Sequence, residues 1–336
     1  MPGVYPVFIF TKKSLLYASL KVFVRLGMKL FCRTIVVNRP GLLRLKGPLL
    51  IASNHPNSFL DGIILDILFD EPIWALARGD VFKKPFYAKL LTAVKLLPVY
   101  RTSEGPENLP INYKTFDACR EIFQKNGVVQ IFSEAKSINE WHLRPLKKGT
   151  ARLAISSWDN GIPLKVLPVG INYSSFRRFG KNVYVNFGDV IHKDDILIHS
   201  TDGKLNKEFN ERLNCAFKQL VFEIDKQDVT RQKEILEQKP FLWQKIIFGL
   251  PAALGFILHA PFYLPVKNFT WKRCHHNDHY DSVMAAILLF TYPVYLLLVS
   301  LLLFFIVKTP WAFSVFLVLP FTAWSCALLK GQLDRH

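Results

Sequence analysis

A histidine and an aspartate lie close together in the segment Asn54-His55-Pro56-Asn57-Ser58-Phe59-Leu60-Asp61, directly after the apolar run Pro48–Ser53. Histidine can accept and return a proton near neutral pH, and a nearby carboxylate can fix its tautomer and stabilise the imidazolium. On one regular helix, two residues six positions apart would point to different sides. Pro56 interrupts the strand, so we expect His55 on a turn and Asp61 in the first turn of the following helix. There the two side chains can meet as a general base and its orienting partner.

The same residues allow a purely structural interpretation. Ser58 and Asp61 have the spacing of a capping box, in which two side chains satisfy the free backbone N–H groups at the start of a helix. That arrangement would need no catalytic role for either residue. The rest of the chain decides between the two interpretations.

Further blocks with chemically useful side chains follow along the chain. They are Leu97-Pro98-Val99-Tyr100-Arg101, Ile131-Phe132-Ser133-Glu134-Ala135-Lys136-Ser137, the basic run Leu143-Arg144-Pro145-Leu146-Lys147-Lys148-Gly149-Thr150, and Leu167-Pro168-Val169-Gly170-Ile171-Asn172. Arg recognises phosphate through a planar fork and Lys as a point charge. These blocks therefore favour an anionic substrate, with a solvated basic face as the alternative for the basic run.

Without the basic run, the four blocks taken in this order resemble the glycerolipid acyltransferase family, which contains glycerol-3-phosphate and lysophosphatidate acyltransferases. The resemblance covers roughly residues 35 to 200. It implies that His55 takes the proton from the acceptor hydroxyl, that Asp61 orients His55, and that the hydroxyl attacks an acyl thioester directly. It also implies that Arg101 holds the acceptor's phosphate and that Glu134 helps to position the acceptor. It implies no metal and no cofactor beyond the co-substrate, acyl-CoA or acyl carrier protein.

The chain departs from the family's usual pattern at several positions. Five residues separate His55 from Asp61 instead of four, as in a subset of bacterial members, and Ser133 and Ala135 stand where the family usually has Pro and Gly. Ser137 and Lys147 match a Ser and a Lys of the glycerol-3-phosphate branch.

The resemblance therefore implies a substrate-binding set of Arg101, Glu134, Ser137, Lys147 and Gly149. We expect a lysophosphatidate acceptor and phosphatidate as the product, with glycerol-3-phosphate or another lysolipid as the alternative acceptor. An inactive membrane scaffold with the same fold is the alternative from another functional class.

The segments that must position these residues alternate between strand and helix. Apolar, β-branched runs predict strands at 48–53, 73–78, 128–132, 166–171 and 183–187, and helical patterns fall near 58–69, 81–95, 112–125 and 147–157. We expect an α/β catalytic domain at 46–205, built on a mostly parallel sheet flanked by helices. Over 205–237, apolar residues at helical spacing predict one amphipathic helix that packs on the domain, so that 206–240 forms this helix and a linker. Its apolar residues are Phe209, Leu213, Phe217, Leu220 and Ile224.

The first 45 residues predict a helix, over 12–37, that lies on a membrane rather than crossing it. Basic residues recur every four positions on one side of this helix, and large apolar residues cover the other side. The basic residues are Lys21, Arg25, Lys29 and Arg33. An ordinary packed amphipathic helix is the alternative.

The region 241–336 predicts membrane segments. Val283–Val307 and Trp311–Leu329 carry no charge and are long enough to span a bilayer, so we expect a transmembrane hairpin over 283–329. Ile246–Val266 contains Pro251, Pro261 and Pro265, which break a regular helix, so we expect it to be re-entrant or interfacial unless it spans. The loop Cys274–Asp281 carries metal-ligand residue types, but their spacing matches no standard zinc site.

The composition limits the possible partners. Lys and Arg outnumber Asp and Glu by 43 to 26, a formal net charge of +17, which indicates an anionic partner such as a membrane surface, an acidic carrier protein or a nucleic acid. Nucleic acid is disfavoured because the basic residues lie on the first helix and around the expected phosphate site. Five scattered cysteines without CxxC spacing favour a reducing compartment. We therefore expect a multi-pass membrane protein with its catalytic domain on the cytoplasmic side.

Overall fold

The computed structural model describes residues 15–100, 109–196 and 202–334, which contain an α/β domain and a long apolar helical region. The domain is built on a seven-stranded sheet in the order β1-β7-β6-β2-β5-β3-β4, in which only the β6–β7 pair is antiparallel. The strands are β1 (Cys32–Val37), β2 (Leu49–Ser53), β3 (Ile73–Arg78), β4 (Leu96–Val99), β5 (Val128–Phe132), β6 (Lys165–Tyr173) and β7 (Lys181–Phe187). This confirms the predicted fold class.

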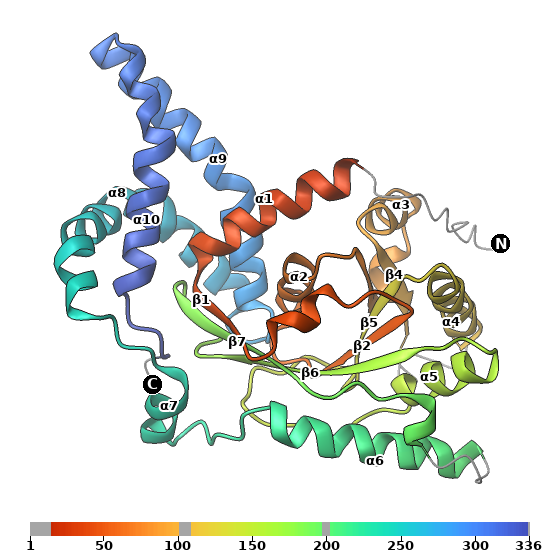
Figure 1. Cartoon of the computed structure of the whole chain (residues 1–336). Helices are drawn as coiled ribbons and strands as arrows, with labels where there is room; N and C mark the ends of the chain where they lie inside the picture. The colour runs from red at the N-terminus through yellow and green to blue at the C-terminus, as the bar shows by residue number, and fades with distance from the viewer. Residues whose placement is uncertain (1–14, 101–108, 197–201, 335–336) are drawn as a thin grey trace.

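Helices cover both faces of the sheet, so its central strands are buried on both sides. All five residues of β2 are buried, as expected for a parallel strand with an uninterrupted apolar run. One core lies against α1 (Leu15–Phe31) and α2 (Ser58–Leu68), and the other against α4 (Leu109–Gln124), α5 (Gly149–Asp159) and α6 (Asp202–Leu220). Figure 1 shows α1 and α2 above the sheet and α6 below it.

The five strands predicted from the sequence are confirmed, and two more were missed. β1 lies where the first helix was expected to continue to residue 37, but the β-branched run from Thr34 to Val37 favours an extended backbone. β4 follows the short helix α3 (Pro85–Ala93), which a 3-10 turn (Gly79–Phe82) precedes. β4 tolerates Pro98 because it is an edge strand, paired on one side only.

The basic side of α1 does not form the continuous outward stripe expected from the sequence. Lys21 Nζ donates to the carbonyl of Phe69 at 2.9 Å, and Arg25 donates to the carbonyl of Ile67 at 2.6 and 2.9 Å. Both cations thus bind carbonyls at the C-terminal end of α2, where the helix dipole favours positive charge. The large apolar side chains that α1 leaves exposed are Leu15, Leu16, Val22 and Leu26.

The single helix expected over 205–237 is two helices. α6 ends at Leu220, Ile224 forms an isolated bridge with Trp141, and α7 (Val229–Leu236) begins after Asp228. The Asp228 side chain accepts a hydrogen bond from Arg231 N, an N-cap signal that the apolar periodicity concealed. Phe209, Leu213, Phe217 and Leu220 pack on the sheet as predicted.

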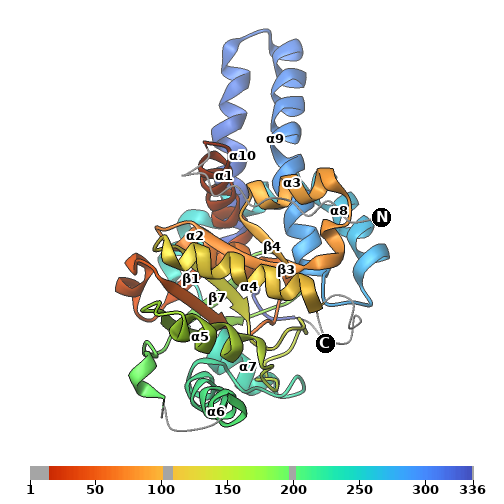
Figure 2. The same ribbon diagram turned by 90° about the vertical axis from the view of Figure 1, so that its right-hand side faces the viewer.

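Three helices in the described residues are long and apolar enough to cross a membrane, by length and composition. They are α8 (Leu242–Cys274), α9 (Tyr280–Val307) and the segment Pro310–Leu329, which contains a 3-10 turn (Pro310–Ser314) and α10 (Val315–Leu329). α9 and α10 project together from the domain (Figures 1 and 2). Both helices expose large apolar side chains, as expected for lipid-facing helices, and α10 also buries part of its surface against α8.

The prolines do not break α8. Pro251, Pro261 and Pro265 all lie inside one continuous helix of 33 residues, so the expected interruption is wrong. α8 packs against α10, and the close approach of the two helices depends on Gly255, where an added Cβ would lie 2.3 Å from the carbonyl oxygen of Thr322. α8 curves beside α10 in Figure 1, as expected of a helix that lacks the hydrogen bonds its prolines cannot make.

Gly170 provides a test of how closely α6 packs on the sheet. A Cβ at this position would lie 2.4 Å from the carbonyl oxygen of Leu220, the last residue of α6. Gly170→Ala should therefore lower the free energy of unfolding by about 1–3 kcal/mol, because the backbone of α6 must move away. Thermal unfolding in detergent measures this. Gly41→Ala is the control, since nothing lies within 4 Å of its added Cβ. Equal stabilities for the two variants would contradict the close packing.

Candidate active site

The turn between β2 and α2 is fixed to the sheet by Asn54. Its side-chain amide donates to the carbonyl of Ile171 at 3.0 Å, and its side-chain oxygen accepts from Ile171 N at 2.7 Å. Both bonds join the carboxyl end of β2 to the neighbouring strand β6. The position of His55 is therefore set by the sheet rather than by a free loop.

His55 and Asp61 meet as the sequence predicted. The distance from His55 Nδ1 to Asp61 Oδ2 is 2.8 Å, and the imidazole stacks on the Phe132 ring with a centroid distance of 3.7 Å. Because an ionised carboxylate can only accept, Nδ1 carries the hydrogen and Nε2 carries the lone pair. The His55 side chain is 15% exposed, whereas Asp61 is fully buried. This is the arrangement that a general base requires.

Asp61 receives two further hydrogen bonds. Asn57 N donates to Oδ2 at 2.8 Å, and the Tyr173 hydroxyl donates to Oδ1 at 2.8 Å. Burial, with a further contribution from the Asp61 carboxylate, raises the pKa of Tyr173 well above its usual value, so this hydroxyl remains a donor. The capping box of Ser58 and Asp61 is not formed, because the N-cap of α2 is Asn57, which makes no side-chain cap bond, and Ser58 Oγ lies 2.7 Å from His279 Nδ1 instead.

The longer spacing between His55 and Asp61 is accommodated at Ser58. This residue has φ = 50°, a left-handed conformation that is uncommon for a residue other than glycine. Its backbone N–H donates to Ser137 Oγ at 2.6 Å, and the carbonyl of His55 accepts from Ile138 N at 3.2 Å. Ser137, predicted to bind substrate, therefore holds the turn that carries His55.

Glu134 is a second buried carboxylate in the site. Its Oε2 accepts from His55 N and its Oε1 accepts from Arg144 N, both at 2.8 Å. Burial raises the pKa of Glu134, although the two N–H donors and the charge of Arg144 act in the opposite direction. Ala135 adopts φ = 61°, so the turn keeps the conformation that glycine usually provides there. Glu134 thus links the His55 turn to the basic run.

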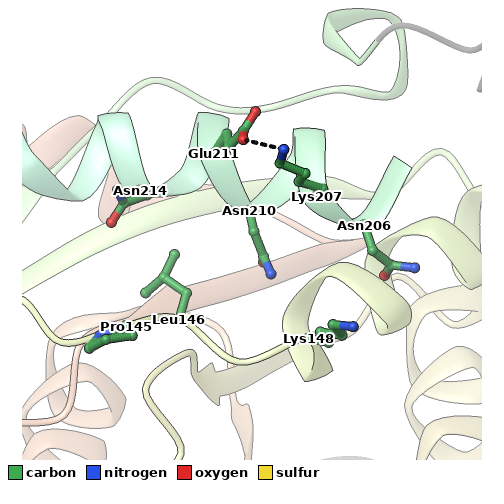
Figure 3. A pocket seen from close by; sticks show the side chains of 8 residues that line it. All are labelled: Pro145, Leu146, Lys148, Asn206, Lys207, Asn210, Glu211 and Asn214. Atoms are coloured by element: carbon green, nitrogen blue, oxygen red, sulfur yellow. Dashed lines mark ion pairs between the residues drawn. The ribbon is translucent and has the colours of Figure 1, made fainter. Parts of the chain in front are cut away.

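The basic run lies beside the end of β5. Lys147 N donates to the carbonyl of Ser133 at 2.8 Å, the Lys147 side chain is exposed, and Gly149 begins α5. A cavity of about 470 Å³ separates this run from α6 (Figure 3). Pro145, Leu146 and Lys148 line one side and Asn206, Lys207, Asn210, Glu211 and Asn214 the other, so this cavity is separate from the His55–Asp61 pair.

Three other basic residues, Arg78, Lys84 and Arg101, lie at or after the ends of β3 and β4 in the sequence. Arg101 follows β4, whose carboxyl end is at the same edge of the sheet as that of β2, but it lies outside the described residues. Arg78 pairs with Asp80 on the surface, at 2.6 Å. Lys84 lies over the ring of Tyr87, with its ammonium 5.9 Å from the ring centroid.

Some residues that contact the site are far from it in the chain and could not be recognised from the sequence. Tyr173 lies in an apolar strand, and nothing local marks it as the partner of Asp61. The segment Cys274–Asp281 was assessed only as a metal site, yet four residues of the loop and of the start of α9 contact the His55 turn or its neighbour Asn139. They are Asp278, His279, Asp281 and Ser282. Among residues 15–100, 109–196 and 202–334, no group of three His, Cys, Asp or Glu side chains could hold a metal ion.

Residues 34–172, which contain His55, Asp61 and Glu134, match the model of the Acyltransferase family. The match covers 139 of the 336 residues of the chain. Over 138 residues the chain is 27% identical to glycerol-3-phosphate O-acyltransferase 1 of Saccharomyces cerevisiae, a match that spans 40% of this chain and only 17% of the yeast protein. A crystal structure of the 1-acyl-sn-glycerophosphate (LPA) acyltransferase PlsC from Thermotoga maritima aligns with a TM-score of 0.40 at 14% identity, over 63% of this chain and 85% of that one.

Glu134 provides a pH-dependent test of the site. Burial raises the pKa of Glu134 above its usual value of 4.5. As the pH rises from 4.5 to this raised pKa, the carboxyl group ionises more readily in the unfolded chain than in the native protein, so the native protein loses stability. Glu134→Gln removes the ionisation and with it this loss. The melting temperature of the variant, minus that of the native protein, should therefore increase between about pH 4 and about pH 7.

Thermal unfolding in detergent across this range measures the effect. Glu211→Gln is the control, because its carboxylate on α6 is 65% exposed. A difference between Glu134→Gln and the native protein that stays constant with pH would contradict the buried carboxylate described above.

Proposed function

We propose that the protein transfers a fatty acyl group from an acyl thioester to the free hydroxyl of a lysophosphatidate, with His55 as the general base. The observation that carries the proposal is the His55 imidazole held by the buried Asp61 carboxylate at 2.8 Å, inside the segment that matches the model of the Acyltransferase family. The protein contributes acid–base chemistry and substrate positioning, and the thioester supplies the acyl group.

In the proposed reaction, Nε2 of His55 removes the proton of the acceptor hydroxyl as its oxygen attacks the thioester carbonyl. The tetrahedral intermediate then expels the thiolate, which receives the proton from His55. The new ester bond replaces the thioester bond, and the histidine returns to its neutral form. Asp61 stabilises the imidazolium between these steps, and alignment of the two substrates supplies much of the rate enhancement.

We assign the acceptor's phosphate to Arg101 and Lys147, with Ser137 and Gly149 as further substrate-binding residues. The exposed side chain of Lys147 supports this assignment, because it extends from a run anchored by Glu134 next to the His55 turn. Glu134 and Ser137 would act mainly by holding this turn, since both are nearly buried. The acyl donor is acyl-CoA or acyl carrier protein.

Glycerol-3-phosphate is the second candidate acceptor. Ser137 and Lys147 favour it, as does the similarity to the yeast glycerol-3-phosphate O-acyltransferase. An inactive scaffold with the same fold is the alternative from another class, motivated by the unusual His55–Asp61 spacing and by Ser133 and Ala135.

We also place the protein in a membrane, with the catalytic domain on the cytoplasmic side. The three long apolar helices support the membrane location. Free cysteines at all five positions and the net positive charge fit a reducing compartment and an anionic lipid surface. Membrane lipids are then both its surroundings and the source of a lysolipid acceptor.

The base is tested with purified protein in detergent, a labelled palmitoyl thioester, and lysophosphatidate and glycerol-3-phosphate offered separately. His55→Ala should lower turnover by about 100- to 10,000-fold, because it removes general base catalysis. His192→Ala is the control, because that histidine is exposed directly before the short 3-10 turn Lys193–Asp195. Turnover unchanged in His55→Ala would contradict the mechanism, and no turnover by the native protein with any lysolipid would favour the scaffold.

Lys147 is tested through the acceptor. Lys147→Ala should raise the KM for the phosphate-bearing acceptor by about tenfold and leave the KM for the thioester unchanged, because a charged contact to phosphate is lost. Initial rates at varied acceptor concentration measure this, with the exposed Lys193→Ala as the control. An equal rise for both substrates would contradict a phosphate-specific role.

A further inference from the structure

The first turn of α9 lies directly against the turn that carries His55. Ser282 Oγ donates to the carbonyl of Asn57 at 2.9 Å and accepts from Leu60 N at 3.2 Å. A single hydroxyl thus binds both the N-cap residue and the first turn of α2. Ser282 is fully buried, so water does not compete for these two bonds.

Asp281 makes the second connection. Its Oδ2 accepts from Asn57 Nδ2 at 2.7 Å and also binds the ammonium of Lys181, which comes from β7. The side chains of Lys181 and Asp281 are 0% and 1% exposed. A charge pair taken so completely out of water holds its geometry tightly, because moving either partner leaves an unpaired buried charge. The start of α9 is therefore fixed to both the sheet and the His55 turn.

Two outer contacts complete the connection. His279 Nδ1 lies 2.7 Å from Ser58 Oγ. Asn139 joins the two segments, because its backbone N–H donates to Asp278 Oδ1 at 3.0 Å and its side chain donates to the carbonyl of Pro56 at 2.7 Å. Three consecutive residues of the turn, from Pro56 to Ser58, are thus connected to the segment that begins the membrane hairpin.

These contacts lead to the reacting atoms through Asn57. The backbone N–H of Asn57 donates to Asp61 Oδ2, the same oxygen that binds His55 Nδ1. We infer that Asp281 and Ser282 are positioning residues, which set the distance and angle of the His55–Asp61 pair by holding Asn57. The seating of the membrane hairpin on the catalytic domain then controls the rate of the chemical step. The expected effect on the rate rests on the proposed function, whereas the expected effect on the structure of the His55 turn does not.

Ser282→Ala tests the inference with a small change. It should lower kcat by about five- to tenfold, since the turn loses two hydrogen bonds, and leave the KM for the thioester unchanged. Ser300→Ala is the matched control, because Ser300 is a fully buried serine of the same helix whose Oγ bonds only within the helix, to Leu296 O at 2.8 Å. A residue that only anchors the hairpin would lower the melting temperature without this fall in kcat.

Hydrogen–deuterium exchange of native and variant protein separates this inference from the proposed function, because it needs no activity. Amides in residues 55–61 should exchange about five- to tenfold faster in Ser282→Ala and at the native rate in Ser300→Ala. Unchanged exchange in Ser282→Ala, or unchanged kcat in an active enzyme, would overturn the inference. Turnover absent from the native protein, together with faster exchange in Ser282→Ala, would leave the positioning role standing and reject the acyltransferase proposal.

The buried charge pair provides an independent variant. Asp281→Leu combined with Lys181→Met removes both charges together, so the folded protein keeps no unpaired charge, while Asn57 loses the acceptor of its side chain. The double variant should unfold at a higher temperature than Asp281→Leu alone and should still show the faster exchange in residues 55–61. A double variant with native exchange would overturn the role of Asp281.

Discussion

The buried carboxylate of Asp61 is the interaction on which the site depends. An ionised carboxylate without partners is very costly inside a protein, and here three donors surround it: the imidazole of His55, the backbone of Asn57 and the hydroxyl of Tyr173. The donors come from the β2–α2 turn and from β6. Asp61 can therefore be satisfied only when β2 and β6 are neighbours and α2 lies across them, so the fold and the site stabilise each other.

Glu134 repeats this arrangement one strand away. It also satisfies its charge with backbone N–H groups, and it comes from the end of β5, on the other side of β2. The two carboxylates are placed differently from the basic residues of the site. Asp61 and Glu134 are buried and hold the backbone, whereas Lys147 and Lys148 are exposed beside them. The negative charges fix geometry, and the positive charges remain free to meet an anionic ligand.

The sequence predicted the parts of this arrangement that are local in the chain. The five central strands, the turn at Pro56 and the contact of His55 with Asp61 all follow from apolar runs, a proline and a short spacing. β1 was missed because it directly follows α1 and was included in the predicted helix over 12–37, and β4 was missed because it has only four residues and contains Pro98. The orientation of Lys21 and Arg25 could not be predicted either, since helical periodicity shows that a basic side exists but not that the end of α2 lies under it. The roles of Tyr173 and Ser282 could not be predicted for the same reason, because both bind residues more than 100 positions away in the chain.

The contact between α9 and the His55 turn explains why polar residues can lie at the start of this apolar helix. Ionisable side chains within membrane helices are costly, and Asp281 lies at the start of a helix that is otherwise almost entirely apolar. It avoids lipid because the catalytic domain covers it, so the domain must meet the helix within its first turn. The uncharged run Val283–Val307 that follows is about 37 Å long at 1.5 Å per residue, enough to cross the hydrocarbon core of about 30 Å. With α9 across a bilayer, the His55 turn would lie at the level of the lipid headgroups, where the hydroxyl of a lysolipid is found. The contacts that hold His55 in place would then also set its depth relative to the substrate.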